Sequence, residues 1–313
     1  MSATVTRALQ LWGLEQASFT LAARRENEVW KVSDGARRLA LRFHRRDYRT
    51  VTELRSELVW MEMLRQAGLV VPQPLRLLDG SLLGQIEGRH VSLLTWLEGR
   101  PMGKMGRLSA DLDAEDFGRR IGAQLARMHE LSDAWTPPVG FHRPDWRCAG
   151  LLGPDPLWGR FWEHPHLDAE QRQLLIATRD RALDGFECFA PDADAGLIHA
   201  DLVAENVLVD RHTVAFIDFD DGAWGYRDFD LATVLVKFIG QPQYGPLRAG
   251  LCDGYALRRR VDPGTLDFML LLRALTYPGW IMSRLDEPGG RERSVRMLDT
   301  ALRLAREFME EKH

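Results

Sequence analysis

The sequence predicts an α+β protein with two lobes, a small antiparallel-sheet N-lobe and a larger, mainly helical C-lobe. The chain of 313 residues exceeds the usual size of one hydrophobic core, which favours two packed lobes. Short strand-like segments dominate up to about Glu98, and helical periodicity dominates after it. The apolar run Leu93 to Leu97 ends at this point and is typical of a strand that enters a linker. We therefore place the lobes at residues 1–98 and 99–313.

The N-lobe is expected to hold a small antiparallel sheet packed around one helix. Three segments, Ser18 to Ala23, Glu28 to Ser33 and Arg38 to Phe43, are rich in strand-forming residues. Asp34-Gly35 separates the second from the third and is a strong hairpin signal. Consecutive strands joined in this way pair as antiparallel neighbours.

The helix of the N-lobe has readable ends and one carboxylate on its apolar side. Thr50 to Glu53 matches a capping box, and Gly68 stands where a glycine C-cap is expected. At about 100° per residue, Glu57 falls inside the apolar arc of this helix. Four apolar residues share that arc: Leu54, Trp60, Met61 and Leu64. Because a buried charge needs a partner, Glu57 should meet a cation.

The C-lobe is predicted to be mainly helical. An apolar stripe that ends near His129 marks one core-facing helix. The stripe consists of Phe117, Ile121, Leu125 and Met128. Leu266 to Leu275 and Val295 to Phe308 supply later helices. Three aromatic residues of this lobe are expected to pack in the core rather than to bind a cation: Trp224, Tyr277 and Trp280.

Composition points to a cytoplasmic protein with a small ligand. The net charge of -4 is spread in interspersed charges, which argues against nucleic acid as a partner. The three cysteines form no CxxC pair, so neither a zinc ribbon nor a disulfide framework is indicated. Met1 to Leu14 lacks the pattern of a secretory leader, and no apolar run reaches membrane-spanning length. We expect no membrane partner, and the sequence leaves the oligomeric state open.

Polar residues interrupt two strand-like segments in the C-lobe. Asn206 to Val209 and Thr213 to Asp218 flank a short turn and should pair as a hairpin, with Asn206 opposite Ile217 and beside Asp218. Two oxygen ligands at one end of a ribbon suit Mg²⁺. Asp201 precedes the ribbon, where its carboxylate can accept a proton from, or orient, a hydroxyl that attacks a γ-phosphate.

These residues resemble the aminoglycoside phosphotransferase and choline kinase superfamily. His199-x-Asp201-x4-Asn206 is followed twelve residues later by Asp218-Phe219-Asp220, as in that superfamily. Leu41 to Arg45 and Ser56 to Trp60 resemble its homoserine-kinase-like and stress-response-kinase-like branch. The resemblance implies a bilobal protein-kinase-like fold, with the N-lobe binding the nucleotide. It also implies ATP as co-substrate, Mg²⁺ as cofactor and a hydroxyl as phosphoryl acceptor.

The resemblance assigns the catalytic and metal-binding residues. Asp201 would be the catalytic base, and His199 would brace the catalytic loop. Asn206 and Asp218 would hold the metal. Asp230 would cap the following helix or hold the catalytic loop.

The same resemblance assigns the nucleotide site. Glu57 would pair with Arg42 on the third strand, where the family usually has a lysine for the phosphates. The segment before the linker, with Thr95, Trp96 and Leu97, would present backbone groups to adenine. No glycine occurs between Gly13 and Gly35, so the usual glycine-rich phosphate cover is replaced by Arg24 to Glu28, with Asn27 as a binding residue.

The acceptor is predicted from charge. Asp220, Asp221 and Asp228 follow Asp218 within ten residues and form an acidic group that favours a cationic acceptor. We therefore expect an ATP-dependent phosphotransferase that acts on a hydroxyl of a small, amine-bearing metabolite. A Ser/Thr protein kinase of the bacterial stress-response type and a nucleotide-binding pseudokinase are the alternatives.

Overall fold

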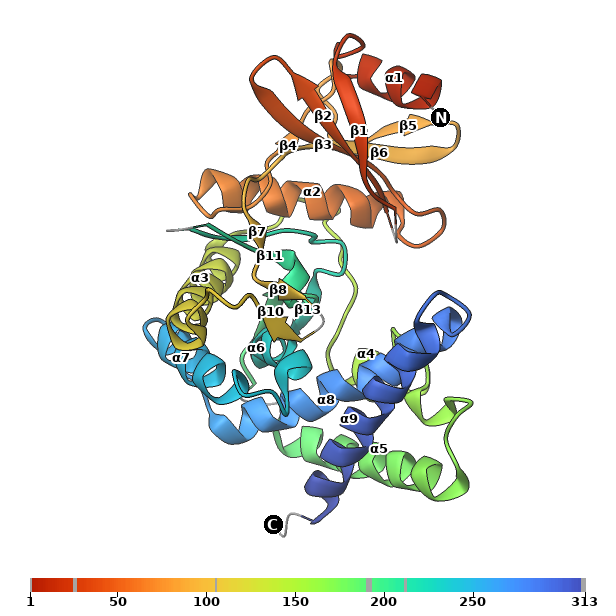
Figure 1. Cartoon of the computed structure of the whole chain (residues 1–313), viewed down its shortest axis with the longest axis vertical. Helices are drawn as coiled ribbons and strands as arrows, with labels where there is room; N and C mark the ends of the chain where they lie inside the picture. Colours follow the sequence, from red (N-terminus) through yellow and green to blue (C-terminus); the bar gives the residue numbers. More distant parts are fainter. Residues whose placement is uncertain (1, 25–26, 105, 190–192, 211–212, 311–313) are drawn as a thin grey trace. The chain divides into compact units, whose positions relative to one another are not determined.

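The computed structural model describes residues 2–24, 27–104, 106–189, 193–210 and 213–310 (Figure 1). The chain forms two compact units. Unit 1 comprises residues 1–102, 130–144 and 205–222, and unit 2 comprises residues 103–129, 145–204 and 223–313. The units thus interleave along the sequence, and a single boundary at Glu98 stays a prediction.

The sheet of unit 1 follows the predicted strands closely. In the described part of the chain it has six strands in the order β1-β2-β3-β6-β4, with β5 also paired to β6, and every pairing is antiparallel. The strands are β1 (Ser18–Arg24), β2 (Glu28–Asp34), β3 (Arg37–Phe43), β4 (Pro74–Leu75), β5 (Gly84–Ile86) and β6 (Arg89–Thr95). Gly35 turns the hairpin between β2 and β3 with a φ of +56°, a backbone conformation that glycine adopts without strain.

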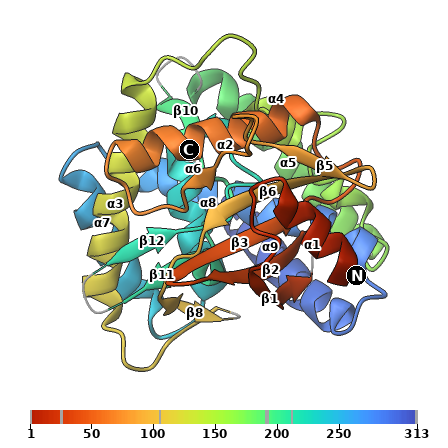
Figure 2. The same cartoon turned by 90° about the horizontal axis from the view of Figure 1, so that it is seen from above.

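Two helices accompany this sheet, where the sequence predicted one. The additional helix, α1 (Ser2–Gln10), lies beside the sheet, and its residues Val5, Ala8 and Leu9 belong to the same buried cluster as the strands (Figure 2). Helix α2 (Val51–Gln66) begins at Thr50 with the predicted capping box. Its buried face includes Glu57, which is fully inaccessible to solvent.

A short three-stranded sheet completes unit 1 and positions the predicted metal ligands. It has the order β12-β11-β7, with β7 at Arg100–Pro101, β11 at Val207–Val209 and β12 at Val214–Phe216. In the β11–β12 pair, Val207 lies opposite Phe216. The predicted hairpin is therefore confirmed with its register, although residues 211 and 212 of its turn lie outside the described residues.

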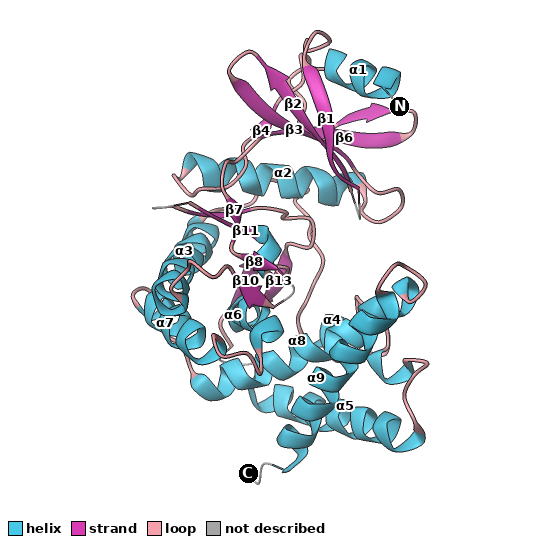
Figure 3. Cartoon of the chain, viewed as in Figure 1, coloured by secondary structure: helices cyan, strands magenta, loops and turns pink. Residues whose placement is uncertain are grey.

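Unit 2 is mainly helical, as Figure 3 shows by colour. Its longer helices are α3 (Ala114–Ala134, of which the last turn belongs to unit 1), α5 (Ala169–Phe189), α6 (Arg227–Leu235), α7 (Tyr244–Ala256), α8 (Pro263–Ile281) and α9 (Gly290–Glu310), and the short α4 spans Cys148–Leu152. Two strand pairs complete it, β8 (Gly103–Lys104) with β9 (Arg107–Leu108), and β10 (Ala195–Ile198) with β13 (Ala223–Tyr226). No helix in the described part of the chain is both long and apolar enough to cross a membrane.

Helices α3 and α7 touch through glycines. A Cβ added at Gly122 of α3 would lie 2.1 Å from the carbonyl oxygen of Leu251, and one added at Gly254 of α7 would lie 1.9 Å from that of Arg119. Real Cβ atoms do not approach backbone oxygens this closely. The two helices therefore pack backbone to backbone, and no side chain larger than that of glycine fits at Gly122 or Gly254.

We expect Gly122→Ala to destabilise the protein by about 1–3 kcal/mol, because the added methyl forces α3 and α7 apart. Chemical denaturation of wild type and variant measures this difference. Gly185→Ala in α5 is the matched control, since nothing lies within 4 Å of a Cβ added there. The control should be stabilised by up to about 1 kcal/mol through helix propensity. Equal stability changes in both variants would contradict the close packing of α3 and α7.

Candidate active site

The predicted metal ligands lie at the open end of the β11–β12 hairpin. The amide of Ile217 donates to the carbonyl oxygen of Asn206 at 3.0 Å, which sets Asn206 directly across from the residue before Asp218. Asp218 is exposed and has a φ of +65°, in the left-handed region. Phe219 is buried with its ring edge-on to Trp60 at 5.3 Å between centroids. An amide and an accessible carboxylate at one strand end offer the hard oxygen donors that Mg²⁺ prefers, so these residues fit that ion.

Arg42 and Glu57 form the predicted pair across unit 1. Arg42 Nη2 donates to Glu57 Oε1 at 2.7 Å, and both side chains are buried. Burial raises the pKa of Glu57, while the adjacent Arg42 guanidinium opposes that rise. Asp220 and Asp218 also act on Arg42 by charge, so the guanidinium lies in the electrostatic field of the predicted metal ligand. Arg42 Nε has no hydrogen-bond partner among the described residues. A phosphate oxygen would satisfy this donor.

Arg143 is a structural residue of this site that sequence reasoning missed. It is almost fully buried and donates to the carbonyl oxygens of Glu53 at 2.9 Å and Phe219 at 3.2 Å, and also to those of Asp220 and Gly222. Arg143 therefore ties the first turn of α2 to the segment that follows Asp218. Its position in a Pro- and Trp-rich irregular stretch carried no sequence signal for this role.

The acidic residues after Asp218 have partners within unit 1. Asp221 pairs with Arg49 at 2.8 Å and accepts a hydrogen bond from the Tyr48 hydroxyl at 2.8 Å. Asp220 is buried, and its Oδ2 accepts from Asn27 Nδ2 at 3.4 Å. Asn27 Oδ1 accepts in turn from the amide of Arg45 at 3.0 Å. Asn27 thus links the loop between β1 and β2 to the metal segment, while residues 25 and 26 of that loop lie outside the described residues.

A second group of possible metal ligands lies beside Arg42. His44, Glu57 and Asp220 are buried and offer ligand atoms within 4.8 Å of one another. Among the described residues, His44 Nδ1, Glu57 Oε2 and Asp220 Oδ1 have no hydrogen-bond partner. Burial lowers the pKa of His44, and the charges of Arg42, His90 and Arg89 lower it further. Glu57 of this group already pairs with Arg42. The assignment of Mg²⁺ to Asn206 and Asp218 stays a prediction.

The segment predicted to contact adenine runs along the end of β6. The Thr95 amide donates to Gln73 O at 2.8 Å, and the Trp96 amide donates to Arg38 O at 2.9 Å. Among the described residues, none accepts a hydrogen bond from the Leu97 amide. Of the three predicted residues, Leu97 therefore has the backbone donor that suits a purine nitrogen.

In unit 2, Asp230 of α6 holds the loop that carries Asp201. Its two carboxylate oxygens accept hydrogen bonds from the backbone amides of His199 and Ala200, both at 2.7 Å. Ala200 has a φ of +63°, so these bonds stabilise a backbone conformation that alanine rarely adopts. Of the two roles implied for Asp230, the structure supports the holding of the loop. His199 is fully buried at the start of this loop.

His129 supports Asp230 from α3. Its Nε2 lies 3.1 Å from Asp230 Oδ2, and its Nδ1 lies 2.8 Å from the Tyr255 hydroxyl. Burial and the nearby Arg227 lower the pKa of His129 to about 4, so the ring is neutral at pH 7. A neutral ring in this setting donates from Nε2 to the carboxylate and accepts the tyrosine proton at Nδ1.

Asp201 contacts a cation that the sequence analysis did not single out. Arg273 Nη2 of α8 donates to Asp201 Oδ1 at 3.0 Å. The arginine is fully buried, whereas about a quarter of the Asp201 side chain is exposed (27%). A lone cation inside the apolar run Leu266 to Leu275 was the available signal. Asp228, the third predicted acid, also belongs to unit 2.

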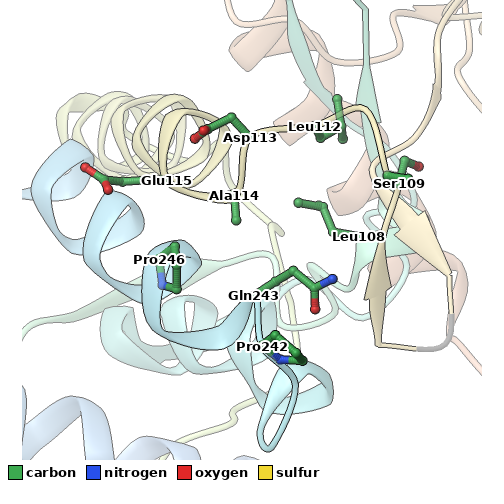
Figure 4. A pocket seen from close by; sticks show the side chains of 10 residues that line it. Leu108, Ser109, Leu112, Asp113, Ala114, Glu115, Pro242, Gln243 and Pro246 are labelled. Carbon is green, nitrogen blue, oxygen red and sulfur yellow. The ribbon is translucent and has the colours of Figure 1, made fainter.

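A pocket of about 520 Å³ lies elsewhere in unit 2, between the segment after β9 and the start of α7 (Figure 4). Leu108, Ser109, Gln243 and Pro246 are among its lining residues. None of the predicted site residues lines this pocket. It therefore adds nothing to the candidate active site.

A family model, curated relatives and solved structures all relate this chain to kinases of small molecules. The sequence model of the phosphotransferase enzyme family matches residues 20–265. A homoserine kinase of Brucella abortus (strain S19) is 31% identical over 234 residues, which cover 72% of this chain and 65% of the kinase. The match thus spans about two thirds of the length of that relative.

Two solved structures resemble the whole chain. A microcompartment-associated aminopropanol kinase has a TM-score of 0.84 and 29% identity, and the match covers 99% of this chain and 98% of that chain. An amicoumacin kinase solved with AMP-PNP and Ca²⁺ has a TM-score of 0.77 and 19% identity, and the match covers 96% and 92% of the two chains. At 19% identity, the similarity to the amicoumacin kinase supports the fold alone. The predicted protein-kinase-like fold, superfamily and kinase class are confirmed, and the chain belongs to the phosphotransferase enzyme family.

Proposed function

We propose that this protein transfers the γ-phosphoryl group of ATP to the hydroxyl of a small amino alcohol. The observation that carries the phosphotransferase assignment is the hairpin register that sets Asn206 beside Asp218, in the same unit as the Arg42–Glu57 pair. This arrangement supports a site for a metal-bound triphosphate. The family match supports the reaction class.

The nucleotide would be bound by unit 1. Arg42 would contact the phosphates, Asn206 and Asp218 would hold Mg²⁺, and the Leu97 amide would contact adenine. When bound, Mg²⁺ supplies charge neutralisation at the phosphate oxygens. Arg143 and Asn27 would keep the segment after Asp218 in place, since both contact it through hydrogen bonds.

Asp201 would act on the acceptor. The hydroxyl oxygen of the acceptor forms a bond to the γ-phosphorus, and the bond from that phosphorus to the bridging oxygen of ADP breaks. The hydroxyl proton passes to the Asp201 carboxylate. Because phosphoryl transfer proceeds through a loose transition state, the main contribution of such a carboxylate is to orient the hydroxyl in line.

The acceptor class rests on the relatives rather than on the predicted acidic group. Aminopropanol and homoserine, the acceptors named for two relatives, are both small molecules with an amine and a free hydroxyl. The acidic group gives weaker support, because Asp221 is paired with Arg49 and Asp220 is buried against Asn27. A role for these acids in substrate binding stays a prediction.

Asp228 lies among other acids of unit 2. Burial, together with the charges of Asp194 and Asp262, raises its pKa to about 7, and Arg259 opposes this rise. A carboxyl group with a raised pKa in the folded state contributes stability below the unfolded pKa of about 4. That contribution is lost as the pH rises through about 7. The charged form of Asp228 therefore costs stability in mildly alkaline solution.

The acceptor proposal is tested by ADP release with a matched set of small molecules. 1-Amino-2-propanol and homoserine should be phosphorylated, whereas propylamine, which lacks the hydroxyl, should give no ADP above background. 2-Propanol, which lacks the amine, should have a kcat/KM lower by about 10²-fold or more. Turnover of a protein serine or threonine with none of these amino alcohols would instead favour the protein-kinase alternative.

The metal assignment is tested with Asp218→Ala. We expect this variant to lose Mg²⁺-dependent ATP affinity, because Asn206 carries no charge to offset the cation. Isothermal titration with ATP in the presence and absence of Mg²⁺ measures the loss. Asp299→Ala, which removes an exposed carboxylate from α9, is the control and should bind like wild type. Unchanged MgATP binding in Asp218→Ala would move the metal site elsewhere.

The surroundings of Asp228 predict a pH-dependent gain of stability in Asp228→Asn. The neutral amide should raise the melting temperature clearly at pH 8 and hardly at about pH 4, because the cost of ionising Asp228 builds up between its unfolded pKa of about 4 and its folded pKa of about 7. Thermal unfolding at both pH values gives the comparison, with Asp299→Asn as the exposed control. A stabilisation that is equal at the two pH values would contradict the raised pKa.

A further inference from the structure

Arg273 is a fully buried cation enclosed by aromatic rings. Its guanidinium carbon lies 4.4 Å from the ring centroid of Trp158, 4.5 Å from that of Tyr277 and 5.5 Å from that of Phe229. We call these three residues the aromatic cage. They come from the segment after α4, from α8 and from α6, so three parts of unit 2 converge on one side chain. The faces of aromatic rings attract a cation, and this attraction strengthens when water is excluded.

The cage is built on close backbone packing. A Cβ added at Gly279 of α8 would lie 2.5 Å from the carbonyl oxygens of both Trp158 and Gly159. A larger residue at position 279 would therefore push the segment with Trp158 away from α8. The absence of a side chain there lets the indole ring reach Arg273 on the same helix.

The polar contacts of Arg273 lead to Asp201. Arg273 Nη1 donates to Thr276 Oγ1 at 3.1 Å, and Nη2 donates to Asp201 Oδ1 at 3.0 Å. Among the described residues, Arg273 Nε has no hydrogen-bond partner, and Asp201 is the one acid within ion-pair distance of Arg273. Aromatic faces do not replace a counter-ion for a buried charge. The Asp201 carboxylate therefore balances the charge of Arg273.

We propose that Arg273 is a positioning residue that pairs with the carboxylate of Asp201 and orients it toward the acceptor hydroxyl. The proposal rests on the proposed function, in which Asp201 receives the hydroxyl proton. The cage fixes the guanidinium, and the guanidinium fixes the carboxylate. Asp230 holds the backbone of the same loop through the His199 and Ala200 amides, so backbone and side chain have separate anchors.

Both anchors are needed because the loop alone does not define the direction of a short carboxylate side chain. A displacement of a reacting group by about 1 Å is enough to slow a reaction by about 10²-fold. A neighbouring cation also makes a carboxylate a weaker base, which suits a transition state in which the hydroxyl loses its proton late. Arg273 thus favours orientation of the hydroxyl over strong proton abstraction.

The kinetic test compares Arg273→Met, Arg273→Lys and wild type with the best amino alcohol acceptor. We expect kcat to fall by about 10²-fold in Arg273→Met, while KM for ATP stays unchanged. Arg273→Lys should recover part of the rate, because it restores a charge but not the planar fork. Arg284→Met is the matched control, since Arg284 also stacks on a tryptophan, Trp280, at 4.3 Å in unit 2. The control should keep the wild-type rate.

A pH profile separates positioning from a merely structural role. In Arg273→Met, the acid limb of kcat/KM should move to higher pH by about one unit or more, because the Asp201 carboxylate loses its cation. His199 and Asp230, the other titratable groups of this loop and its anchor, remain unchanged in the variant. A wild-type acid limb in an otherwise folded Arg273→Met would overturn the proposal.

A stability cycle tests the pair without any activity measurement. Asp201→Asn should lower the melting temperature, because it leaves Arg273 buried without an anion. In an Arg273→Met background, Asp201→Asn should lower the melting temperature far less. Additive changes in melting temperature would show that Asp201 and Arg273 are not coupled. That result would contradict the proposal even if Asp201 is essential for activity. If coupling is found but Asp201→Asn keeps the wild-type kcat, the proposed function fails and the ion pair is only structural.

Discussion

Burying a charged side chain without a partner costs several kcal/mol, and this constraint organises the candidate site in both units. Glu57 is buried on α2 and meets Arg42 on β3. Asp230 is buried on α6 and is satisfied by His129 and by two amides of the loop that leads to Asp201. In both cases at least one partner of the buried charge is a predicted site residue or the backbone of the loop that leads to Asp201. The same interactions that permit folding therefore also position residues that we predict to take part in the reaction.

Arginine has an unusually large part in this arrangement, and its planar fork explains why. Arg143 reaches four carbonyl oxygens on two separate segments, which a single ammonium group would satisfy less completely. Arg273 combines ring stacking with a directed contact to Asp201. Arg42 stands where the family usually has a lysine. No glycine occurs between Gly13 and Gly35, so we propose that the planar fork of Arg42 would supply phosphate contacts in place of backbone amides.

The aromatic residues of unit 2 have a role that composition alone does not indicate. The sequence predicts that Tyr277 packs in the core, and Tyr277 is indeed buried. Its ring also faces a cation, but that cation is Arg273 of the protein rather than a bound substrate. Trp158 adds a second face to the same guanidinium. The rings of the core thus contact the arginine that pairs with Asp201, so repacking of these rings would change the surroundings of the Asp201 carboxylate.

Several local features of this fold follow from the sequence alone. The capping box at Thr50, the inward face with Glu57 and the register that sets Asn206 beside Asp218 all follow from short-range periodicity and turn geometry, and each was predicted. Helix α1 was not predicted, because nine residues with one apolar face form a stable helix only when a sheet covers that face.

Contacts between distant segments were decided by the tertiary structure. Arg143 lies 76 residues from Phe219, and Arg273 lies 72 residues from Asp201. No periodicity or spacing encodes such pairs, since they depend on how helices and loops pack. A lone arginine in an apolar run, such as Arg273, can be expected to be buried, but the sequence does not show which group it meets. Only the fold decides which carbonyl or carboxylate lies within hydrogen-bond distance of its guanidinium, because burial removes water as the alternative partner.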